Sequence, residues 1–410
     1  MAQFVALSDA QQMPPWRRPI ALLFLMAVAM PLGFSTWNAL LNNFVKEAAQ
    51  FDGFDISALH FLREIPGFLA VGVILLLLFF REQWLGLASL ALLGIATALT
   101  AQFPFYGGIM VLTILSSIGF HYYETVNQSL QLQWLPKDRA PQMLGWLLSA
   151  GSAATFCVYF VILLLWKPFG LSYNTLYMIG GGLCLVIALF AMLAYPNFEA
   201  PHPQTKKMVL RKRYWLYYAL QFMAGGRRQI FMIFAGWMMV EKFGFEVHEI
   251  AGLYLINLVI NIIAAPFLGQ IVARFGERNA LVFEYAGLVC VFVAYAGVYF
   301  LNWGFAVAAA LYVLDHIFFG LALALKTYFQ KVGDPRDMAP TAAVAFTINH
   351  IAAVALPLPL GLLWLASPAA VFLVAAGMAA ISLILALMIP RHPEPGNETI
   401  FSRPVPTAAE

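Results

Sequence analysis

The sequence predicts an all-α membrane protein with twelve transmembrane helices in two pseudo-symmetric six-helix bundles. The first observation is composition: of 410 residues, 62% are hydrophobic and 10% are charged, whereas soluble domains are about 25% charged. The second is length: apolar runs of about 20 residues recur from Ile20 to Pro390, and each can cross a hydrocarbon core of about 30 Å. Because the runs are continuous rather than alternating with period 2, they are not the strands of an outer-membrane barrel.

The third observation is that the apolar runs form two sets of six around a polar stretch at residues 196–213. We expect the spans of an N-terminal bundle, residues 20–195, at 20–45, 57–79, 83–101, 106–132, 142–166 and 173–195. We expect those of a C-terminal bundle, residues 214–389, at 214–240, 247–272, 279–301, 303–330, 340–365 and 368–389. Residues 1–19 and 390–410 are expected as tails, and the first run is expected to remain as a span because no convincing cleavage site follows it.

The Lys and Arg residues of the loops indicate the orientation, because they are retained on the cytoplasmic side during insertion. One side of the expected topology holds sixteen of them, and the other holds only Lys46, Lys167 and Lys242. We therefore expect a multi-pass protein of the inner, cytoplasmic membrane with both termini in the cytoplasm. The net charge of +3 is too small to indicate a nucleic-acid partner. The basic linker 196–213 is expected to serve topology and contact with anionic lipids, with regulatory docking as the alternative.

An internal repeat supports the division into halves. Residues 136–141 read Pro-Lys-Asp-Arg-Ala-Pro, and residues 335–340 read Pro-Arg-Asp-Met-Ala-Pro. Each stretch follows the fourth span of its half and leads directly into the fifth. Parallel repeats of this kind build transporters that have a cavity near the middle of the membrane.

The loop after the eighth span carries a further motif. Residues 269–278 read Gly-Gln-Ile-Val-Ala-Arg-Phe-Gly-Glu-Arg and resemble the cytoplasmic-loop signature of the major facilitator superfamily, although Ala273 stands where that family usually has Asp. Together with the spans and the repeat, the resemblance covers about residues 17–392. It implies alternating access, with a substrate between the halves and spans one, four, seven and ten lining the cavity. It also makes Arg274 and Arg278 candidate gating residues, whose ion pairs would break as the halves rock.

Ionisable side chains near the bilayer centre cost roughly 2.5 to 3.5 kcal/mol each, so they usually face a cavity or a partner. In span four, polar residues recur at i, i+3, i+7 and i+10 and share one helical face, with Asn127 beside it. This pattern favours a wall of a wet cavity, and interhelical hydrogen bonding is the alternative. The residues of the stripe are His121, Glu124, Gln128 and Gln131.

Arg227 and Arg228 follow two glycines in the middle of span seven. Adjacent residues on a helix point about 100° apart, so we expect one arginine to face the cavity and the other to pair with an intramembrane acid. Because a guanidinium offers a planar fork of donors to a carboxylate or phosphate, an anionic substrate group is the sharper interpretation. An internal ion-pair network is the alternative.

Span ten places Asp315 and His316 in its middle. A desolvated carboxyl and an imidazole both titrate in a range that suits proton exchange. Since the chain has no nucleotide-binding motif, a proton gradient is the simplest energy source, and Glu124, Asp315 and His316 are the candidate carriers. The alternative is that they pair with basic residues and do not titrate.

Further polar residues complete the candidate site. Arg63 and Glu64 are adjacent near the outer end of span two, where we expect an outer gate or a helix-to-helix ion pair. Glu284, alone in span nine, is expected to be structural. The additional residues expected to line the cavity, with helix packing or membrane-interface contact as the alternative for the tryptophan, are Trp37, Asn38, Tyr254, Asn257 and Asn261.

The sequence lacks the motifs of several kinds of chemistry. It has no Gly-x-x-x-x-Gly-Lys-Ser/Thr phosphate loop, no His-Glu-x-x-His and no Gly-x-Ser-x-Gly. We therefore expect neither an enzyme nor a bound metal or cofactor. Cys157, Cys184 and Cys290 all lie in apolar runs, which favours packing over a disulfide framework.

These observations predict a monomeric secondary transporter that moves a small organic anion by alternating access, coupled to protons. The partners are then the substrate, protons and the lipid bilayer. One alternative is a proton-driven exporter of hydrophobic or cationic compounds, in which Glu124 or Asp315 attracts the positive group and the arginines balance charge. Another is a receptor or assembly factor with a degenerate transporter fold.

Overall fold

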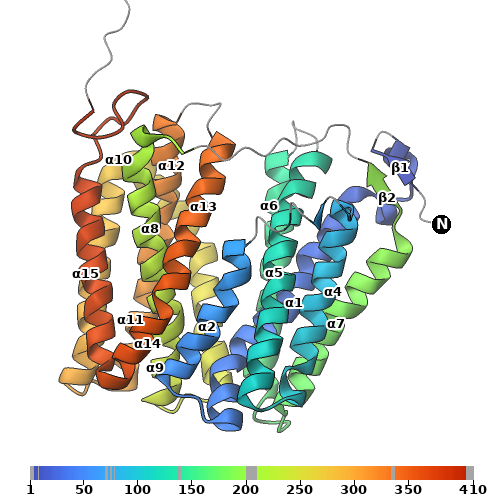
Figure 1. Ribbon diagram of the computed structural model, residues 1–410, viewed down its shortest axis with the longest axis horizontal. Coiled ribbons are helices and arrows are strands. Elements are labelled where there is room, and N and C mark those ends of the chain that lie inside the picture. The colour runs from blue at the N-terminus through green and yellow to red at the C-terminus, as the bar shows by residue number, and fades with distance from the viewer. Residues whose placement is uncertain are drawn as a thin grey trace, which may run out of the picture. The chain divides into compact units, whose positions relative to one another are not determined.

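The computed structural model describes residues 4–7, 9–69, 73, 76–77, 79–135, 140–199, 210–333 and 338–402. Nearly all of the regular structure is helical (Figure 1). The chain divides into two compact units. The N-terminal unit comprises Met1–Asp52, Leu62–Gln204 and Phe245–Leu255, and the C-terminal unit comprises Gly53–Phe61, Thr205–Gly244 and Ile256–Glu410.

The N-terminal unit is built on long apolar helices. Helix α4 packs against both α5 and α7, and α1 packs against α6 and α7. A Cβ on Gly94 of α4 would lie 2.7 Å from the carbonyl oxygen of Gly181 in α7, so the missing side chains let these two helices approach backbone to backbone. The helices are α1 (Pro19–Ala49), α2 (Gly53–Phe68), α4 (Glu82–Leu99), α5 (Tyr106–Trp134), α6 (Ala140–Leu165) and α7 (Tyr173–Ala194), with the 3-10 turn η4 (Thr100–Gln102) after α4.

A short sheet ties the start of the chain to the end of α7. Strand β1 (Phe4–Ala6) pairs in parallel with β2 (Asn197–Glu199). The side chain of Gln83 donates to the Pro196 carbonyl at 2.8 Å and accepts from the Phe198 amide at 2.9 Å, which fixes β2 against α4. The 3-10 turns η1 (Asp9–Gln12) and η2 (Pro15–Arg17) follow β1 and lead into α1.

The C-terminal unit has a similar helical core, in which α8 packs against α13 and α15. Helix α8 (Trp215–Ile230) follows the 3-10 turn η5 (Lys212–Tyr214) and continues through a π-helical turn, η6 (Phe231–Ala235), into α9 (Gly236–Glu241). The other helices are α10 (Val247–Phe300), α11 (Phe305–Phe319), α12 (Leu323–Val332), α13 (Met338–Ala355), α14 (Pro357–Ala366) and α15 (Pro368–Leu387), with the 3-10 turn η7 (Gly320–Ala322) between α11 and α12.

Each unit contains one short segment from the other half of the sequence. In the C-terminal unit, the start of α2 packs on α14, because Gly361 leaves room for the Ser57 side chain. In the N-terminal unit, the Asn43 side chain donates to the Phe245 carbonyl at 2.6 Å, and Lys167 forms an ion pair with Glu246 at 3.3 Å. Both segments lie next to connections that the sequence analysis expects on the outer side.

The helices agree with the predicted spans over most of their length. Within the described residues, nine helical stretches are long and apolar enough to cross a membrane. Two expected spans are interrupted: 303–330 by η7, and 340–365 at Leu356, where α13 gives way to α14. Residues 136–139 and 334–337 of the two repeat loops, most of the linker 196–213 and part of the expected span 57–79 lie outside the described residues.

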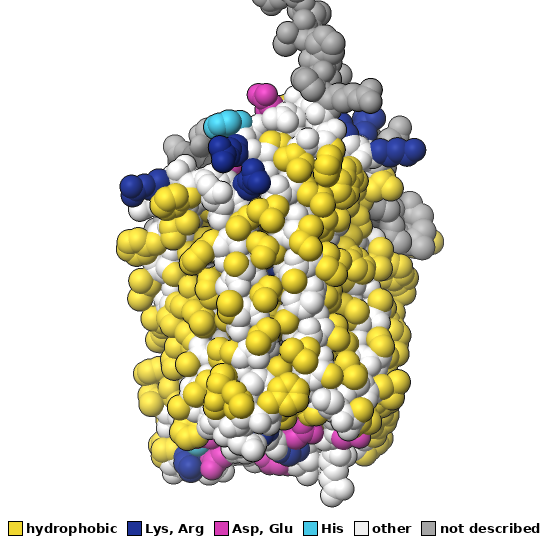
Figure 2. Space-filling model, turned by 90° about the vertical axis from the view of Figure 1, so that its left-hand side faces the viewer, with side chains coloured by type: hydrophobic (Ala, Val, Ile, Leu, Met, Phe, Trp, Pro, Cys, Tyr) yellow, Lys and Arg dark blue, Asp and Glu magenta, His cyan; other side chains and the backbone are white. Residues whose placement is uncertain are grey.

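The surface has the distribution of side chains that a membrane protein needs. On the face drawn in Figure 2, hydrophobic side chains cover the middle, and charged side chains gather near the two ends. Exposed apolar residues on the helices include Leu193, Phe283 and Ile384. A wide exposed apolar surface bounded by charge marks the region that lipid covers.

Candidate functional site

Arg227 lies at the centre of a buried cluster of charged side chains in the C-terminal unit. Helix α8 carries it in its last turn, with only 3% of the residue exposed. Its guanidinium carbon lies 4.3 Å from the centre of the Tyr285 ring, and its Nε donates to the Met223 carbonyl at 3.3 Å. A cation over an aromatic face is stabilised by the quadrupole of the ring, so Tyr285 helps to hold this charge away from water.

Two carboxyl groups interact electrostatically with the Arg227 guanidinium. Glu284 of α10 and Asp315 of α11 are 1% and 3% exposed, and each interacts electrostatically with Arg227. Glu284 also interacts with Asp315. The atoms Nη1 of Arg227, Oε2 of Glu284 and Oδ1 of Asp315 have no hydrogen-bond partner among the described residues. Arg227 thus acts on two intramembrane acids without an ion pair to either among the described residues, and one of the two acids is Glu284, which was expected to be structural.

Arg228 has different surroundings from those of Arg227. It is half-buried, and its Nη2 donates to the Asn349 side-chain oxygen at 3.0 Å. The Asn349 amide in turn donates to the Gln221 carbonyl at 3.3 Å. Gly225 makes this contact possible, because a Cβ there would collide with the Asn349 backbone. The two adjacent arginines thus lie in different environments: Arg227 lies near two carboxyl groups, and Arg228 bonds to a neutral amide.

His316 lies against aromatic rings rather than in an ion pair. The imidazole is 5.4 Å from the centre of the Phe231 ring and stacks on Tyr312 at 6.2 Å. Its Nδ1 is buried without a hydrogen-bond partner among the described residues. Phe231 begins the π-helical turn η6, so this irregular turn is in contact with one of the predicted proton carriers.

In the N-terminal unit, the predicted gate residues form a buried ion pair. Arg63 Nη2 and Glu64 Oε1 of α2 are 2.7 Å apart, and both side chains are almost fully buried. The Arg63 guanidinium carbon also lies 5.7 Å from the centre of the Trp37 ring and 6.0 Å from that of Phe34, both on α1. Trp37 is 2% exposed, which makes it a packing partner of this ion pair.

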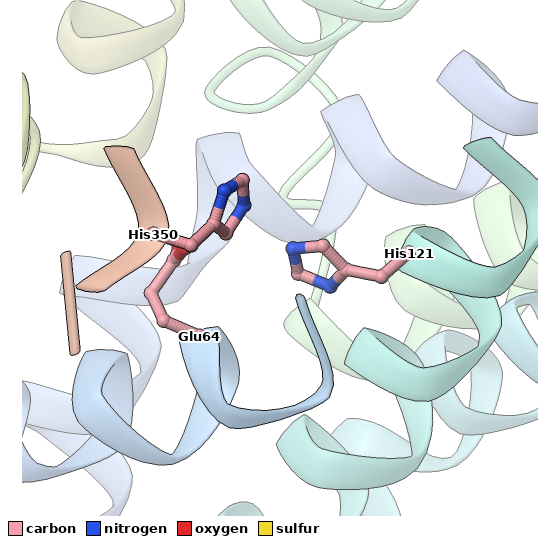
Figure 3. Close-up of side chains that lie close together, drawn as sticks. All are labelled: Glu64, His121 and His350. Carbon is pink, nitrogen blue, oxygen red and sulfur yellow. The ribbon is translucent and has the colours of Figure 1, made fainter. Parts of the chain in front are cut away.

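His121 of α5 lies close to the same ion pair. One of its ring nitrogens lies within 4.8 Å of a Glu64 carboxylate oxygen (Figure 3), and its Nδ1 is 3.0 Å from the Ser117 hydroxyl. Two ligand atoms are fewer than the three or four protein ligands of a typical transition-metal site, so this pair alone does not form one. His350, also labelled in Figure 3, comes from α13 of the C-terminal unit, where its Nδ1 is 2.9 Å from the Phe346 carbonyl oxygen.

The remaining residues of the span-four stripe differ in exposure. Asn127 is buried, and its side-chain oxygen has no hydrogen-bond partner in the described part of the chain. Glu124 is half-buried, and Gln128 is exposed. The stripe therefore runs from buried His121 through half-buried Glu124 and exposed Gln128 to half-buried Gln131.

The polar residues predicted on spans one and eight have the following places. The Asn38 side chain of α1 lies near the Tyr159 hydroxyl of α6, and the Tyr159 ring packs on Tyr254 of α10 at 5.5 Å. Asn257 is buried, and neither side-chain amide atom has a hydrogen-bond partner within the described ranges. Asn261 is half-buried.

The motif at residues 269–278 forms a bend inside α10. Gly276 has φ 79° and ψ 161°, which breaks the helix at this residue. The ion pair seen here joins Glu277 to Lys331 of α12 at 2.8 Å. Arg274 is exposed and lies 5.5 Å over the Phe275 ring, and Arg278 is half-buried. Glu277 thus supplies a charged contact between two helices of the unit.

Comparisons with known proteins agree with this architecture. The nucleoside transporter NupG has a similar structure, with a TM-score of 0.68 and 15% identity over 90% of this chain and 98% of that one. A bacterial metal transporter gives a TM-score of 0.65 with 13% identity over 90% and 98%. A bacterial homologue of the iron transporter ferroportin, in an inward-facing state, gives 0.67 with 13% identity over 92% and 99%. No curated protein matches the chain in sequence.

The family model of the Major Facilitator Superfamily matches residues 23–357, which is most of the chain. This match and the structural similarities confirm the predicted fold class, an all-α membrane protein with twelve helices in two six-helix bundles. They also agree with the resemblance of the 269–278 loop to the superfamily signature. The chain is a multi-pass membrane protein and belongs to the Major Facilitator Superfamily, a family of membrane transporters.

Proposed function

We propose that the protein is a secondary active transporter that moves a small organic anion by alternating access and uses protons as its energy source. The observation that carries this proposal is the difference in surroundings between two neighbouring arginines in the last turn of α8. Arg227 is buried with Glu284 and Asp315, while Arg228 is half-buried and bonds to a neutral amide. Arg228 is therefore the arginine that we assign to the substrate.

A guanidinium suits this role because it remains charged and presents parallel donors to a carboxylate, sulfonate or phosphate. The bond from Arg228 to Asn349 orients the side chain along α13. An anion that reached this position would add a charge-assisted hydrogen bond, which is stronger than a neutral one.

We assign the other predicted residues to supporting roles. The proton carriers are Glu124, Asp315 and His316, and the gates are the Arg63–Glu64 ion pair and the loop that carries Arg274 and Arg278. Both termini lie in the cytoplasm in this proposal, and the monomer, without a cofactor, is the functional form. The residues assigned to contact with the body of the substrate are Trp37, Asn38, His121, Asn127, Gln128, Tyr254, Asn257 and Asn261.

The structurally similar proteins named above carry nucleosides or metals, and at 15% identity or less they show a common fold alone. A second function, export of hydrophobic or cationic compounds, is favoured by one observation. The carboxyl groups of Glu284 and Asp315 outnumber the single guanidinium with which they interact, so the cluster can balance another positive charge. The two functions predict opposite ligands, which makes them easy to separate.

The test begins with a thermal-shift screen of the detergent-purified protein against carboxylates, sulfonates, phosphorylated metabolites and lipophilic cations. Ligand binding to the native state raises its apparent stability by mass action. We expect an organic anion to raise the melting temperature, and a response to lipophilic cations alone would support the exporter instead.

The arginine assignment is tested with the anions found in that screen. Arg228→Gln should abolish the thermal shift, and Arg228→Lys should retain part of it because it keeps the charge but not the fork. Arg213→Gln is the matched control, since Arg213 lies outside α8 on a tyrosine ring and its loss should leave the shift unchanged. Equal shifts for Arg228→Gln and the wild type would contradict the assignment.

A further inference from the structure

We infer that Glu284 and Asp315 hold one proton between them, with Arg227 balancing the charge of the carboxylate that remains. This inference rests on the proposed function and deepens it, because it names the site of the coupling proton. It assigns Glu284 as half of a shared carrier and Arg227 as an internal counter-charge rather than a substrate ligand.

The charges of the cluster balance only when one carboxyl is protonated. Arg227 contributes one positive charge, and the two carboxyl groups contribute two negative charges when both are ionised. All three residues are at most 3% exposed, and an unbalanced ion in such surroundings is strongly disfavoured. One proton on either carboxyl makes the cluster neutral.

The Arg227 guanidinium is not bonded to either carboxyl. Arg227 lies over the Tyr285 ring and bonds to a carbonyl of its own helix. No ion pair joins it to Glu284 or Asp315 at 4.0 Å or less within the described chain. The positive charge of Arg227 therefore acts on both carboxyl groups through space, without an ion pair to either. Because neither carboxylate is preferred by an ion pair, the proton can reside on either group.

Three polar atoms of the cluster lack hydrogen-bond partners among the described residues. Glu284 Oε2, Asp315 Oδ1 and Arg227 Nη1 are buried and make no hydrogen bond to any described residue. A protonated carboxyl needs an acceptor for its hydrogen, and a carboxylate needs donors. Unpartnered oxygens on both acids, together with an unpartnered donor, are what a site with an ordered water between the groups would show, and such a water can pass a proton from one acid to the other.

Other titratable groups near the cluster do not change the balance of charges among Arg227, Glu284 and Asp315. Tyrosine hydroxyls are uncharged at neutral pH, and His316 lies among aromatic rings. Arg228 is directed to Asn349. Titratable residues on the helices that carry or contact the cluster include Arg228 on α8, Tyr285, Cys290 and Tyr295 on α10, Tyr312 and His316 on α11, and His350 on α13.

The test is infrared spectroscopy of the purified full-length protein at neutral pH, in water and in heavy water, with the carbonyl band of protonated carboxyl groups as the readout. Glu284→Gln and Asp315→Asn should each remove one protonated carboxyl, since either variant leaves a balanced pair with Arg227. The triple variant R227Q/E284Q/D315N, whose cluster is neutral, should also lose only one. Arg227→Gln should gain one, because both acids must then be neutral.

Glu277→Gln is the matched control. Glu277 lies on the same helix and is 4% exposed, but it has its own ion pair with Lys331, so its replacement should leave the carbonyl band unchanged. A thermal unfolding transition like that of the wild type shows that a variant is folded. If a variant does not fold, the carbonyl band of the wild-type protein is recorded against pH instead. The inference then expects one protonated carboxyl group of the cluster to lose its proton as the pH rises.

Two results would overturn the inference. A loss of two protonated carboxyls in the triple variant means that both acids are neutral, and no loss in any variant means that both are ionised. Neither result requires a transported substrate, so it would leave the proposed transport of an anion standing. Failure of the anion screen, conversely, would leave the infrared result interpretable.

Discussion

At the scale of single residues, the surroundings of Arg228 depend on one small residue in its own helix. This residue is Gly225, whose missing side chain lets α8 touch the backbone of α13 at Asn349. Asn349 then accepts the hydrogen bond from Arg228. The sequence shows the glycine next to the arginines but gives no indication of the helix that it allows to approach.

Gly225→Ala is therefore expected to push Asn349 away from Arg228. Overpacking of this kind costs about 1–3 kcal/mol, so the melting temperature of the purified protein should fall, and any anion-induced thermal shift should weaken. Gly377→Ala in α15 is the control, because nothing lies within 4 Å of the added Cβ. Equal melting temperatures for the two variants would contradict the close approach.

Residue patterns in the sequence could predict part of the candidate site. The pair Arg227–Arg228 and the carboxyl of Asp315 are conspicuous because charges are rare in apolar spans. Glu284 has no helical pattern of polar neighbours, and its importance depends on the packing that brings α8, α10 and α11 together. Long-range packing of this kind cannot be derived from the periodicity of one segment.

At the scale of elements, α10 shows where span prediction succeeds and where it stops. The sequence predicts two spans, 247–272 and 279–301, and the structure has a helical stretch from Val247 to Phe300 that is broken at Gly276. The apolar runs of the sequence locate both parts of α10, because the length of an apolar run is a property of that segment alone. The left-handed φ of Gly276 and the 3-10 turn at Gly320–Ala322 are set by local backbone geometry, which apolar runs do not report.

Gly276→Ala should destabilise the bend in α10. Strain in this region of φ and ψ costs a residue with a side chain on the order of 1–3 kcal/mol. No atom lies within 4 Å of the added Cβ, so a steric clash does not contribute. Thermal unfolding measures the effect. Gly304→Ala, which is equally open but has a negative φ, should unfold like the wild type, and a similar loss in both variants would show that the backbone of Gly276 is not the cause.

At the scale of the whole molecule, the expected orientation rests on the uneven distribution of Lys and Arg between the loops. A membrane-impermeant maleimide tests it in intact cells that carry the protein without its three native cysteines. Lys167→Cys should be labelled from outside, and Arg211→Cys only after the membrane is made permeable. Both sites are exposed in the structure, so burial cannot explain a difference, and the reverse pattern would invert the topology.

Twelve spans in two halves were predictable from the sequence, because hydrophobic length, loop charge and the internal repeat are each properties of the chain itself. The short segments at the starts of α2 and α10, which pack in the other unit, were not predictable. They are held by contacts such as that of Asn43 with Phe245, which join residues far apart in the sequence.

The central claim is that a proton gradient drives an organic anion through this protein. The most direct measurement is uptake of a radiolabelled anion from the thermal-shift screen into liposomes that contain the purified protein, with and without an imposed pH gradient. The account predicts accumulation above the external concentration that requires the gradient and disappears when a protonophore removes it. Equal uptake with and without the gradient would contradict it.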